Sequence, residues 1–470
     1  MSVRQNLTPA AQPRATIALL GSLVVPMFFA SGDTSSEIAR VYAISVGIGL
    51  LASAALDYNG NIRNLVRADL MGLGSLYFLT LFEFLLPQPE FNELVAVHEV
   101  RPALDACLIG FAGLAIGRHL APQAPTSLQR MLQGEFSSKA FLTIYTVCLI
   151  FGYLHMLIAV NFDFVEMVNM FMRPRFSQPW TRGRFGDWKA LLGEIGMLLY
   201  LVPPIAGIVL ARRKDYHLPQ LLYVSITFLF TIFYGFTSGT RNIFATYLAT
   251  FLVAYAFADE QRRKLELVVV GAIVATLMLV ATVTMLEFRN IGFEAYLAGY
   301  RENVEEQEAN FFVDYNLYVI SKLVGIFPQQ HDFLGWEIPY LSLIRPIPRA
   351  IWSGKPEGLS LSIEEAVGVE GLTLASSFVG EAFMSGGTLG VLLTALAFGG
   401  VNAWWNRLGR SDNSAFGHLV FASGFFAAVI SMRSMFVFTT AILPTIGALV
   451  LGNWLIGIKP RKRVVHEPQE

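Results

Sequence analysis

The chain has 470 residues, of which 54% are hydrophobic and only 15% are charged. Soluble domains carry about 25% charged residues, so this composition excludes a soluble globular protein and indicates an integral membrane protein. The formal net charge of -1 excludes no class of function, because in a membrane protein the distribution of charge matters more than its sum. Cys107 and Cys148 both fall inside apolar segments, so no disulfide or metal framework is predicted from them.

Apolar segments long enough to cross a membrane recur along the whole chain. A helix needs about 20 apolar residues to span the hydrocarbon core. Twelve segments are of this kind, at approximately 15–31, 38–56, 68–86, 103–120, 140–161, 190–211, 219–237, 241–258, 265–286, 386–405, 414–432 and 434–457. We therefore predict an all-α polytopic membrane protein, a single membrane domain over residues 1–470 with about 12 transmembrane helices.

The connections between these segments predict an orientation. Basic residues collect on one side, which the positive-inside rule assigns to the cytoplasm; they include Arg63, Arg67, the stretch 118–139, the triplets at 212–214 and 262–264, and the tail at 459–463. The other side receives acidic or neutral turns. FFASG at 28–32 resembles a signal-peptide cleavage site, but its removal would place Arg63 and Arg67 outside, so we favour a retained anchor. Both termini are then cytoplasmic, and the connections 162–189 and 287–385 lie outside.

The connection 162–189 is basic although it is predicted to lie outside the membrane. It carries four arginines, Arg173, Arg175, Arg182 and Arg184. Since translocating cations opposes the insertion bias, the loop is a candidate anion site, with Trp180 suited to stacking on a sugar ring. The alternative is an interfacial segment whose arginines contact anionic lipid headgroups while its tryptophans lie in the aromatic belt.

Two span ends on the same predicted side carry an Arg-Asn pair. These are Arg241 with Asn242 in SGTRN at 238–242, and Arg289 with Asn290 in LEFRNIGFE at 286–294. The first pair opens a helix, whose free N–H groups would face an external anion together with the guanidinium. Ions at a membrane edge are functional-site hypotheses. The alternatives are an arginine that snorkels to the headgroups and a helix end whose charges reach water.

The long connection 287–385 contains further candidates. An amphipathic helix is predicted at 314–328, on the membrane surface. In RPIPRAIWSGKP at 345–356, prolines rigidify a backbone that carries Arg345, Arg349 and Lys355 around Trp352. Fixed cations beside an aromatic side chain suit recognition of a pyrophosphate joined to a sugar, and a Pro-rich structural bracket is the alternative.

Two charged residues near the last spans complete the candidate site. Glu381 lies in an otherwise uncharged run at 373–390 and is a candidate general base toward a hydroxyl group, or a salt-bridge partner for a nearby arginine. Arg433 is the lone cation in the turn before the last span. The sequence has no phosphate-binding loop, no HExxH, no GxSxG elbow and no external DxD-like pair, so chemistry there would use neither metal nor ATP. It would need an activated donor already carried in the membrane.

The order of three motifs resembles a known family. SGTRN heading a span, a long external loop ending in IPRAIWSGKP, and then SSFVGEAFMSGGTLG resemble bacterial Wzy-type O-antigen and exopolysaccharide repeat-unit polymerases. The chain is also similar to enterobacterial common antigen polymerases in its Gly-Thr-Arg turn and its Ile-Pro…Trp…Pro phrase. The motifs cover roughly 220–440, and the topology covers the whole chain.

The resemblance implies a GT-C-like glycosyltransferase of the bacterial inner membrane. It would act at the periplasmic face on undecaprenyl-pyrophosphate-linked oligosaccharide repeat units, transferring the growing glycan to an incoming unit. Arg241, Arg289 and Arg349 would stabilise the charge that develops on the pyrophosphate, and Glu381 would take the acceptor proton. Family members also carry important arginines in the loop that corresponds to 173–184. Expected partners are membrane lipids, a chain-length regulator and a flippase, and no cofactor, metal or nucleic acid is expected.

Three other functions stay open at this point. An O-antigen ligase would share the chemistry but use a lipid A core as acceptor, and His331 in the external loop is the residue that would favour it. A polysaccharide flippase or other transporter would usually show internal repeats and broken helices, and the sequence shows no repeat between its halves. A scaffold or export subunit of an exopolysaccharide machine is the third.

Overall fold

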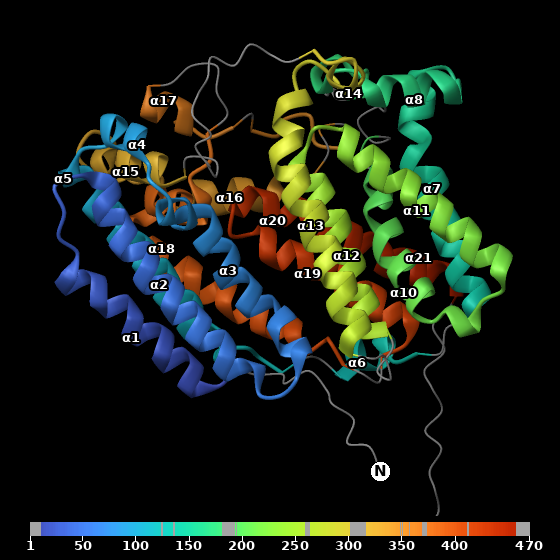
Figure 1. Cartoon of the computed structure of the whole chain (residues 1–470), viewed down its shortest axis with the longest axis horizontal. Helices are drawn as coiled ribbons and strands as arrows, with labels where there is room; N and C mark the ends of the chain where they lie inside the picture. Colours follow the sequence, from blue (N-terminus) through green and yellow to red (C-terminus); the bar gives the residue numbers. More distant parts are fainter. Residues whose placement is uncertain are drawn as a thin grey trace, which may run out of the picture.

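The computed structural model describes residues 11–123, 126–134, 137–180, 193, 195–258, 264–300, 316–347, 349, 351–356, 358–368, 374–410 and 413–456. Throughout these ranges every regular element is a helix, and none is a strand. The prediction of an all-α membrane protein is therefore confirmed in its fold class. Figure 1 shows the long helices running side by side, with several short helices gathered at one end.

Each of the twelve predicted segments contains helix. The long elements are α1 (Pro13–Phe29), α2 (Ser35–Tyr58), α3 (Ala68–Thr80), α5 (Val97–Gly117), α7 (Ser138–Ala159), the 3-10 helix η4 (Gly196–Leu201) with α10 (Val202–Ala211), α11 (Leu218–Thr237), α12 (Arg241–Ala258), α13 (Lys264–Phe288), α18 (Ser377–Asn406), α19 (Ala415–Ile430), and α20 (Met435–Ala441) with α21 (Leu443–Ile456). Among the described residues, seven helices are long and apolar enough to cross a membrane: α2, α5, α7, α11, α12, α18 and the stretch Met435–Gly452. The other apolar helices are shorter.

The short helices distinguish the two ends of the bundle. At one end lie α4 (Pro89–Leu94), α8 (Phe164–Met172), α14 (Phe293–Leu297), α15 (Asn316–Ile326) and α17 (Ile363–Val367), whereas α6 (Thr126–Leu132) lies at the other (Figure 1). We call the first end the loop face. Connections that the sequence analysis placed outside thus lie together, opposite a connection that it placed in the cytoplasm.

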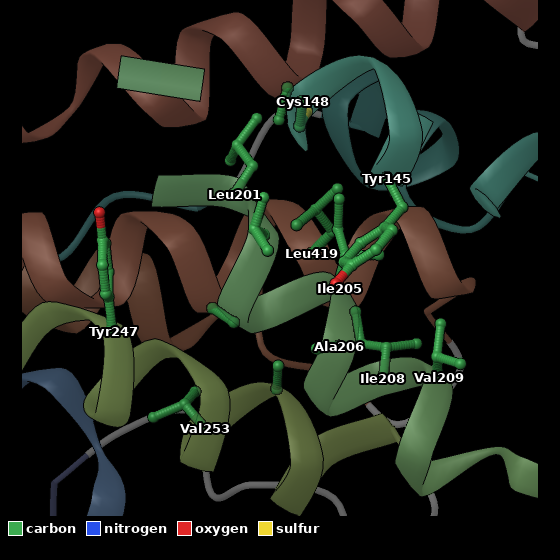
Figure 2. Close-up of a cluster of buried hydrophobic side chains, with 14 of the residues drawn as sticks. Tyr145, Cys148, Leu201, Ile205, Ala206, Ile208, Val209, Tyr247, Val253 and Leu419 are labelled. Carbon is green, nitrogen blue, oxygen red and sulfur yellow. The ribbon is translucent and has the colours of Figure 1, made fainter. Parts of the chain in front are cut away.

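The buried apolar side chains form two large cores. The central core is built mainly by α7, α10, α11, α12 and α19, and Figure 2 shows side chains from α7, α10, α12 and α19 that converge in it. The N-terminal core is built mainly by α1, α2, α3, α5, α15 and α18. Because α19 packs against α12 on one side and against α3 and α18 on the other, it joins the two cores.

Glycines let α5 and α18 pack with their backbones close together. A Cβ atom at Gly117 would lie 2.4 Å from the carbonyl oxygen of Leu396, and one at Gly399 would lie 2.5 Å from that of Leu114. Apolar helices gain little from the hydrophobic effect in lipid, so close van der Waals packing between small residues stabilises such pairs. This contact fixes α18, the helix that begins at Ser377 on the loop face.

The helix α18 is broken near its loop-face end. Gly386 (φ -169°, ψ 33°) and Gly387 (φ 60°, ψ -148°) leave the helical conformation, and the positive φ of Gly387 favours glycine at that position. The carbonyl groups of Met384 and Ser385 accept hydrogen bonds of 2.8 and 2.9 Å from the loop that precedes α16 (Glu337–Ile344). The second half of α18 agrees with the predicted span 386–405.

The helix predicted at 314–328 forms as α15, but its expected place on the membrane surface is wrong. Leu317, Ile320 and Leu323 are fully buried in the N-terminal core, where α15 packs against α5 and α18. The apolar spacing of this segment predicts a helix with an apolar face. It does not say whether lipid or protein covers that face, and here protein does.

A network of buried charges lies at the end opposite the loop face. Arg118 pairs with Asp57 at 3.0 Å and Arg67 pairs with Asp69 at 2.7 Å, and all four side chains are essentially inaccessible. The Nη2 atom of Arg118 also donates to Thr16 of α1 at 2.7 Å. The positive-inside rule correctly grouped Arg67 and Arg118, yet the structure uses both to join α1, α2, α3 and α5 rather than to contact lipid.

Replacing one carboxylate of this network tests its structural role. We expect Asp57→Ala to lower the free energy of unfolding by about 3–5 kcal/mol, because it leaves the buried Arg67 and Arg118 to share the carboxylate of Asp69. The exposed Asp215 provides a matched control, and Asp215→Ala should change stability by less than about 0.5 kcal/mol. Unfolding in mixed detergent micelles measures both. Equal effects of the two substitutions would contradict this role.

Candidate functional site

Two predicted substrate-binding or catalytic arginines meet at the loop face, and a third lies within electrostatic range of one of them. The backbone N–H of Arg175, in the loop after α8, donates to the carbonyl oxygen of Arg289 at the end of α13, at 3.2 Å. Both guanidinium groups lie over the ring of Phe176, at 5.3 and 5.7 Å from its centroid. Arg433, in the turn between α19 and α20, is the third. We call Arg175, Arg289 and Arg433 the cation cluster.

The pKa of Arg175 responds to the charges of the other two arginines. Burial lowers the pKa of its guanidinium, and the positive charges of Arg289 and Arg433 lower the pKa further. Like charges that face one another raise each other's energy. An anion bound among the three would be attracted by all of them and would relieve this repulsion.

Glycines in two connections bring the arginine-bearing segments together. Gly292 has a φ of 89°, and a Cβ atom there would lie 2.8 Å from the ring of Pro174. Gly239, in the turn before α12, has a φ of 64°, and its Cβ would lie 3.3 Å from the Cα of Arg289. The backbone of Arg289 therefore closely approaches Gly239. This packing places the start of α12 beside the cation cluster.

One donor atom of the cluster lacks a hydrogen-bond partner among the described residues. The Nε atom of Arg289 is buried and has no hydrogen-bond partner within the described part of the chain. A buried donor left unpaired costs about 1–3 kcal/mol, so an acceptor oxygen that reached this atom would gain a full hydrogen bond. The ring of Phe176, 58% exposed, lies beside it and offers an open aromatic face. The sequence instead predicted that Trp180 would stack on a sugar ring.

Trp180 and Arg173 have local partners in the structure. The indole of Trp180 donates to Gln178 at 3.2 Å and meets the ring of Phe171 edge-on at 5.7 Å, so it packs within an aromatic group. Arg173 is exposed and forms an ion pair of 3.7 Å with Glu166. Neither residue joins the cation cluster. The predicted Arg182 and Arg184 lie outside the described residues.

A second group surrounds Glu381, which is buried with 5% of its surface exposed. Its Oε1 accepts from the hydroxyl of Ser434 at 2.5 Å, and its Oε2 accepts from the backbone N–H of Met435 at 2.6 Å. Arg345 interacts electrostatically with this carboxylate and lies over the ring of Phe436, at 5.5 Å from its centroid. Glu381 thus fixes the start of α20 and the turn that carries Arg433.

The cations of the 345–356 segment mostly bind their own backbone. The Nζ of Lys355 donates to the carbonyl oxygens of Arg345 at 2.7 Å and Ile347 at 3.0 Å, where it satisfies the C-terminal end of α16. The Nη2 of Arg349 donates to the carbonyl oxygen of Pro356 at 3.2 Å. This geometry supports the structural bracket for Lys355 and Arg349. Arg345 is the exposed cation of the segment, and Trp352 is half-buried.

A cavity of about 190 Å³ lies between α12, α19, α20 and α21. It was not predicted from the sequence. One wall carries Asn242, Thr246 and Thr250, which recur every four residues along α12. Ser423 and Thr440 contribute from α19 and α20, and apolar side chains form most of the remainder. The four-residue spacing of polar residues in an apolar span is the signal that could have revealed this wall.

Two predicted residues lie at the edges of this arrangement. Arg241 is half-buried at the first position of α12, directly before the cavity-lining Asn242. Asn290 is exposed beside Arg289, at the end of α13. The site thus consists of the cation cluster, the Glu381 group and the cavity, supplied by segments that are far apart in the sequence.

Comparisons with known proteins identify no relative: no protein-family model, curated protein or solved structure matches this chain. In the part of the chain that the structure describes, no group of three or more His, Cys, Asp or Glu side chains is placed to hold a metal ion.

Substitution of Arg289 tests the cation cluster as an anion site. Arg289→Gln should weaken binding of inorganic pyrophosphate to the detergent-solubilised protein about 10- to 100-fold, since hydrogen bonds to charged groups contribute about 1.5–3 kcal/mol. Isothermal titration calorimetry measures the affinity. The matched control is Arg173→Gln, which removes an exposed arginine outside the cluster and should leave the affinity nearly unchanged. If both variants lose affinity equally, the cluster is not the site.

Proposed function

We propose that this protein is a metal-independent glycosyltransferase that polymerises undecaprenyl-pyrophosphate-linked oligosaccharide repeat units, as Wzy-type polymerases do. It would transfer the growing glycan from its lipid pyrophosphate to an incoming lipid-linked unit, in the synthesis of an O-antigen or exopolysaccharide. The proposal includes about 12 transmembrane helices in a GT-C-like arrangement. It places the protein in a bacterial inner membrane, with both termini in the cytoplasm and the loop face toward the periplasm.

The observation that carries this proposal is the cation cluster at the ends of apolar helices. Arg175, Arg289 and Arg433 lie where α8, α13 and the α19–α20 turn reach the loop face. A pyrophosphate attached to a membrane lipid sits at the boundary between hydrocarbon and water, which is where helix ends of this kind lie. The buried Nε of Arg289, which has no hydrogen-bond partner in the part of the chain that the structure describes, supports an oxyanion as the ligand.

The proposed reaction needs stabilisation of negative charge more than any other catalytic effect. The bond between the anomeric carbon of the donor sugar and the pyrophosphate oxygen breaks, while a hydroxyl oxygen of the acceptor forms a bond with that carbon. The electron pair of the broken bond stays on the pyrophosphate, and preorganised cations lower the barrier by stabilising it. Arg175, Arg289 and Arg433 would supply this effect, with Arg241 at the start of α12 beside them.

The proton of the acceptor hydroxyl requires a base. Among the proposed site residues Glu381 is the only carboxylate, and it is held by Ser434 and Met435 at hydrogen-bond distance. In the proposed reaction its Oε1 exchanges the Ser434 hydroxyl for the acceptor hydroxyl and takes the proton. Its second oxygen keeps the N–H of Met435 and so holds the carboxylate in place.

A transporter of lipid-linked sugars is the second candidate, because α18 is broken at Gly386 and Gly387. Discontinuous helices in transporters offer free backbone groups to the substrate or coupling ion. Here the carbonyl groups of Met384 and Ser385 already accept hydrogen bonds from the loop before α16. These two carbonyl groups at the break are therefore already hydrogen-bonded within the chain, which favours the polymerase.

Reconstitution distinguishes these two functions. Purified protein in proteoliposomes, supplied with undecaprenyl-pyrophosphate-linked repeat units, should yield a ladder of chain lengths on a gel. Arg289→Gln should lower the rate about 100- to 1,000-fold, the effect of losing one preorganised donor. Arg173→Gln serves as the control and should keep most of the rate. Movement of lipid-linked sugar across the bilayer without a ladder would refute the polymerase and support the transporter.

A further inference from the structure

The short helix α16 (Glu337–Ile344) begins at the break of α18. The backbone N–H groups of Leu334 and Gly335 donate to the carbonyl oxygens of Met384 and Ser385 at 2.8 and 2.9 Å. Directly after the break, α18 continues as the apolar part of a candidate membrane span. These two hydrogen bonds therefore place the residues just before α16 beside the break of α18, next to the start of this second part of the helix.

Both sides of α16 are apolar. Ile338, Leu341 and Ile344 are buried where the helix packs against α18 and α20. On the other side, Trp336 and Leu343 are 83% and 72% exposed, and Tyr340 lies between them. A helix that is apolar all round belongs in a protein core or in a membrane, because an ordinary surface helix turns a polar side to water. Some apolar medium must therefore cover the exposed side.

The polar groups of α16 are turned toward its own chain. Glu337 accepts hydrogen bonds from the backbone N–H and the hydroxyl of Ser360, the latter at 2.7 Å. The C-terminal carbonyl groups of Arg345 and Ile347 accept from Lys355. The exposed side of the helix is thus left with aromatic and aliphatic side chains.

Three features of the structure favour lipid as that apolar medium. The exposed apolar surface continues onto α18, where Leu389 and Leu393 are exposed just after the break in the candidate span. Tryptophan and tyrosine are also the residues enriched where a membrane meets water, which fits Trp336 and Tyr340. The exposed Arg345 follows Ile344 and suits contact with lipid phosphate groups.

We infer that α16 is an interfacial helix whose exposed side, formed by Trp336, Tyr340 and Leu343, inserts into the membrane leaflet at the loop face. The phospholipid bilayer is its partner. Anchored there, α16 holds Arg345 at the depth of the phosphate groups, next to the Glu381 group of the site. This inference does not depend on the polymerase reaction, because it concerns how the loop face contacts lipid.

Spin labelling of the full chain in proteoliposomes of phosphatidylethanolamine and phosphatidylglycerol tests this inference. A nitroxide at Leu343→Cys should collide severalfold more with oxygen, which dissolves in lipid, than with a water-soluble nickel chelate. The native Cys107 and Cys148 are both buried, so the introduced cysteine is the one that the reagent reaches. A label at Ser353→Cys, an exposed position in the same connection, is the control and should prefer the nickel chelate.

Two results would overturn the inference. A label at 343 that collides with the nickel chelate as often as the label at 353 would place this side of α16 in water. A label shielded from both reagents would show that protein, such as a second copy or another subunit, covers it. If Leu343→Cys does not yield folded protein, Tyr340→Cys gives the same readout on the same side of the helix.

Discussion

The arrangement of the loop face depends on the hydrogen bonds that the buried carboxylate of Glu381 accepts. It lies on α18 and binds Ser434 and Met435 at the start of α20, and both α18 and Met435 belong to the N-terminal core. A further backbone hydrogen bond of 3.1 Å joins Phe378 to Met432 in the same place. The turn held by these bonds carries Arg433. These bonds therefore fix the position of the third arginine of the cation cluster.

The charged side chains are arranged differently at the two ends of the molecule. At the end opposite the loop face, Arg67 and Arg118 are fully buried with Asp57 and Asp69 as partners, so opposite charges compensate one another. At the loop face, Arg175 has two other arginines among its main electrostatic neighbours. Buried ion pairs join helices at the first end. The arginines of the loop face are those to which the proposed function assigns the binding of an anion.

The fold was largely predictable from the sequence, since apolar length and charge asymmetry identify the helices and the grouping of their connections. The sequence also identified Arg175, Arg289 and Arg433 as unusual cations for their positions. It could not show that they meet, because their contacts depend on Gly239 and Gly292 accepting close backbones. Nor could the sequence distinguish these three arginines from Lys355 and Arg349, which donate to carbonyl groups of their own segment.

Sequence patterns could not show what surrounds each helix. The apolar spacing of α15 was correctly interpreted as a helix, yet protein rather than lipid covers it. Conversely, α16 has no amphipathic pattern, and its exposed Trp336 and Leu343 become visible only when its neighbours are known. A one-dimensional pattern records which residues are apolar, and the fold decides what each apolar side contacts.

The central claim is that the cation cluster recognises the pyrophosphate of a membrane lipid. Its most direct test is equilibrium binding of undecaprenyl pyrophosphate, undecaprenyl phosphate and undecaprenol to the protein in nanodiscs, for the natural chain and for Arg175→Gln/Arg289→Gln. The account predicts that affinity falls in that order for the natural chain and that the double variant binds all three alike. Equal affinity of the natural chain for the alcohol and the pyrophosphate would contradict it.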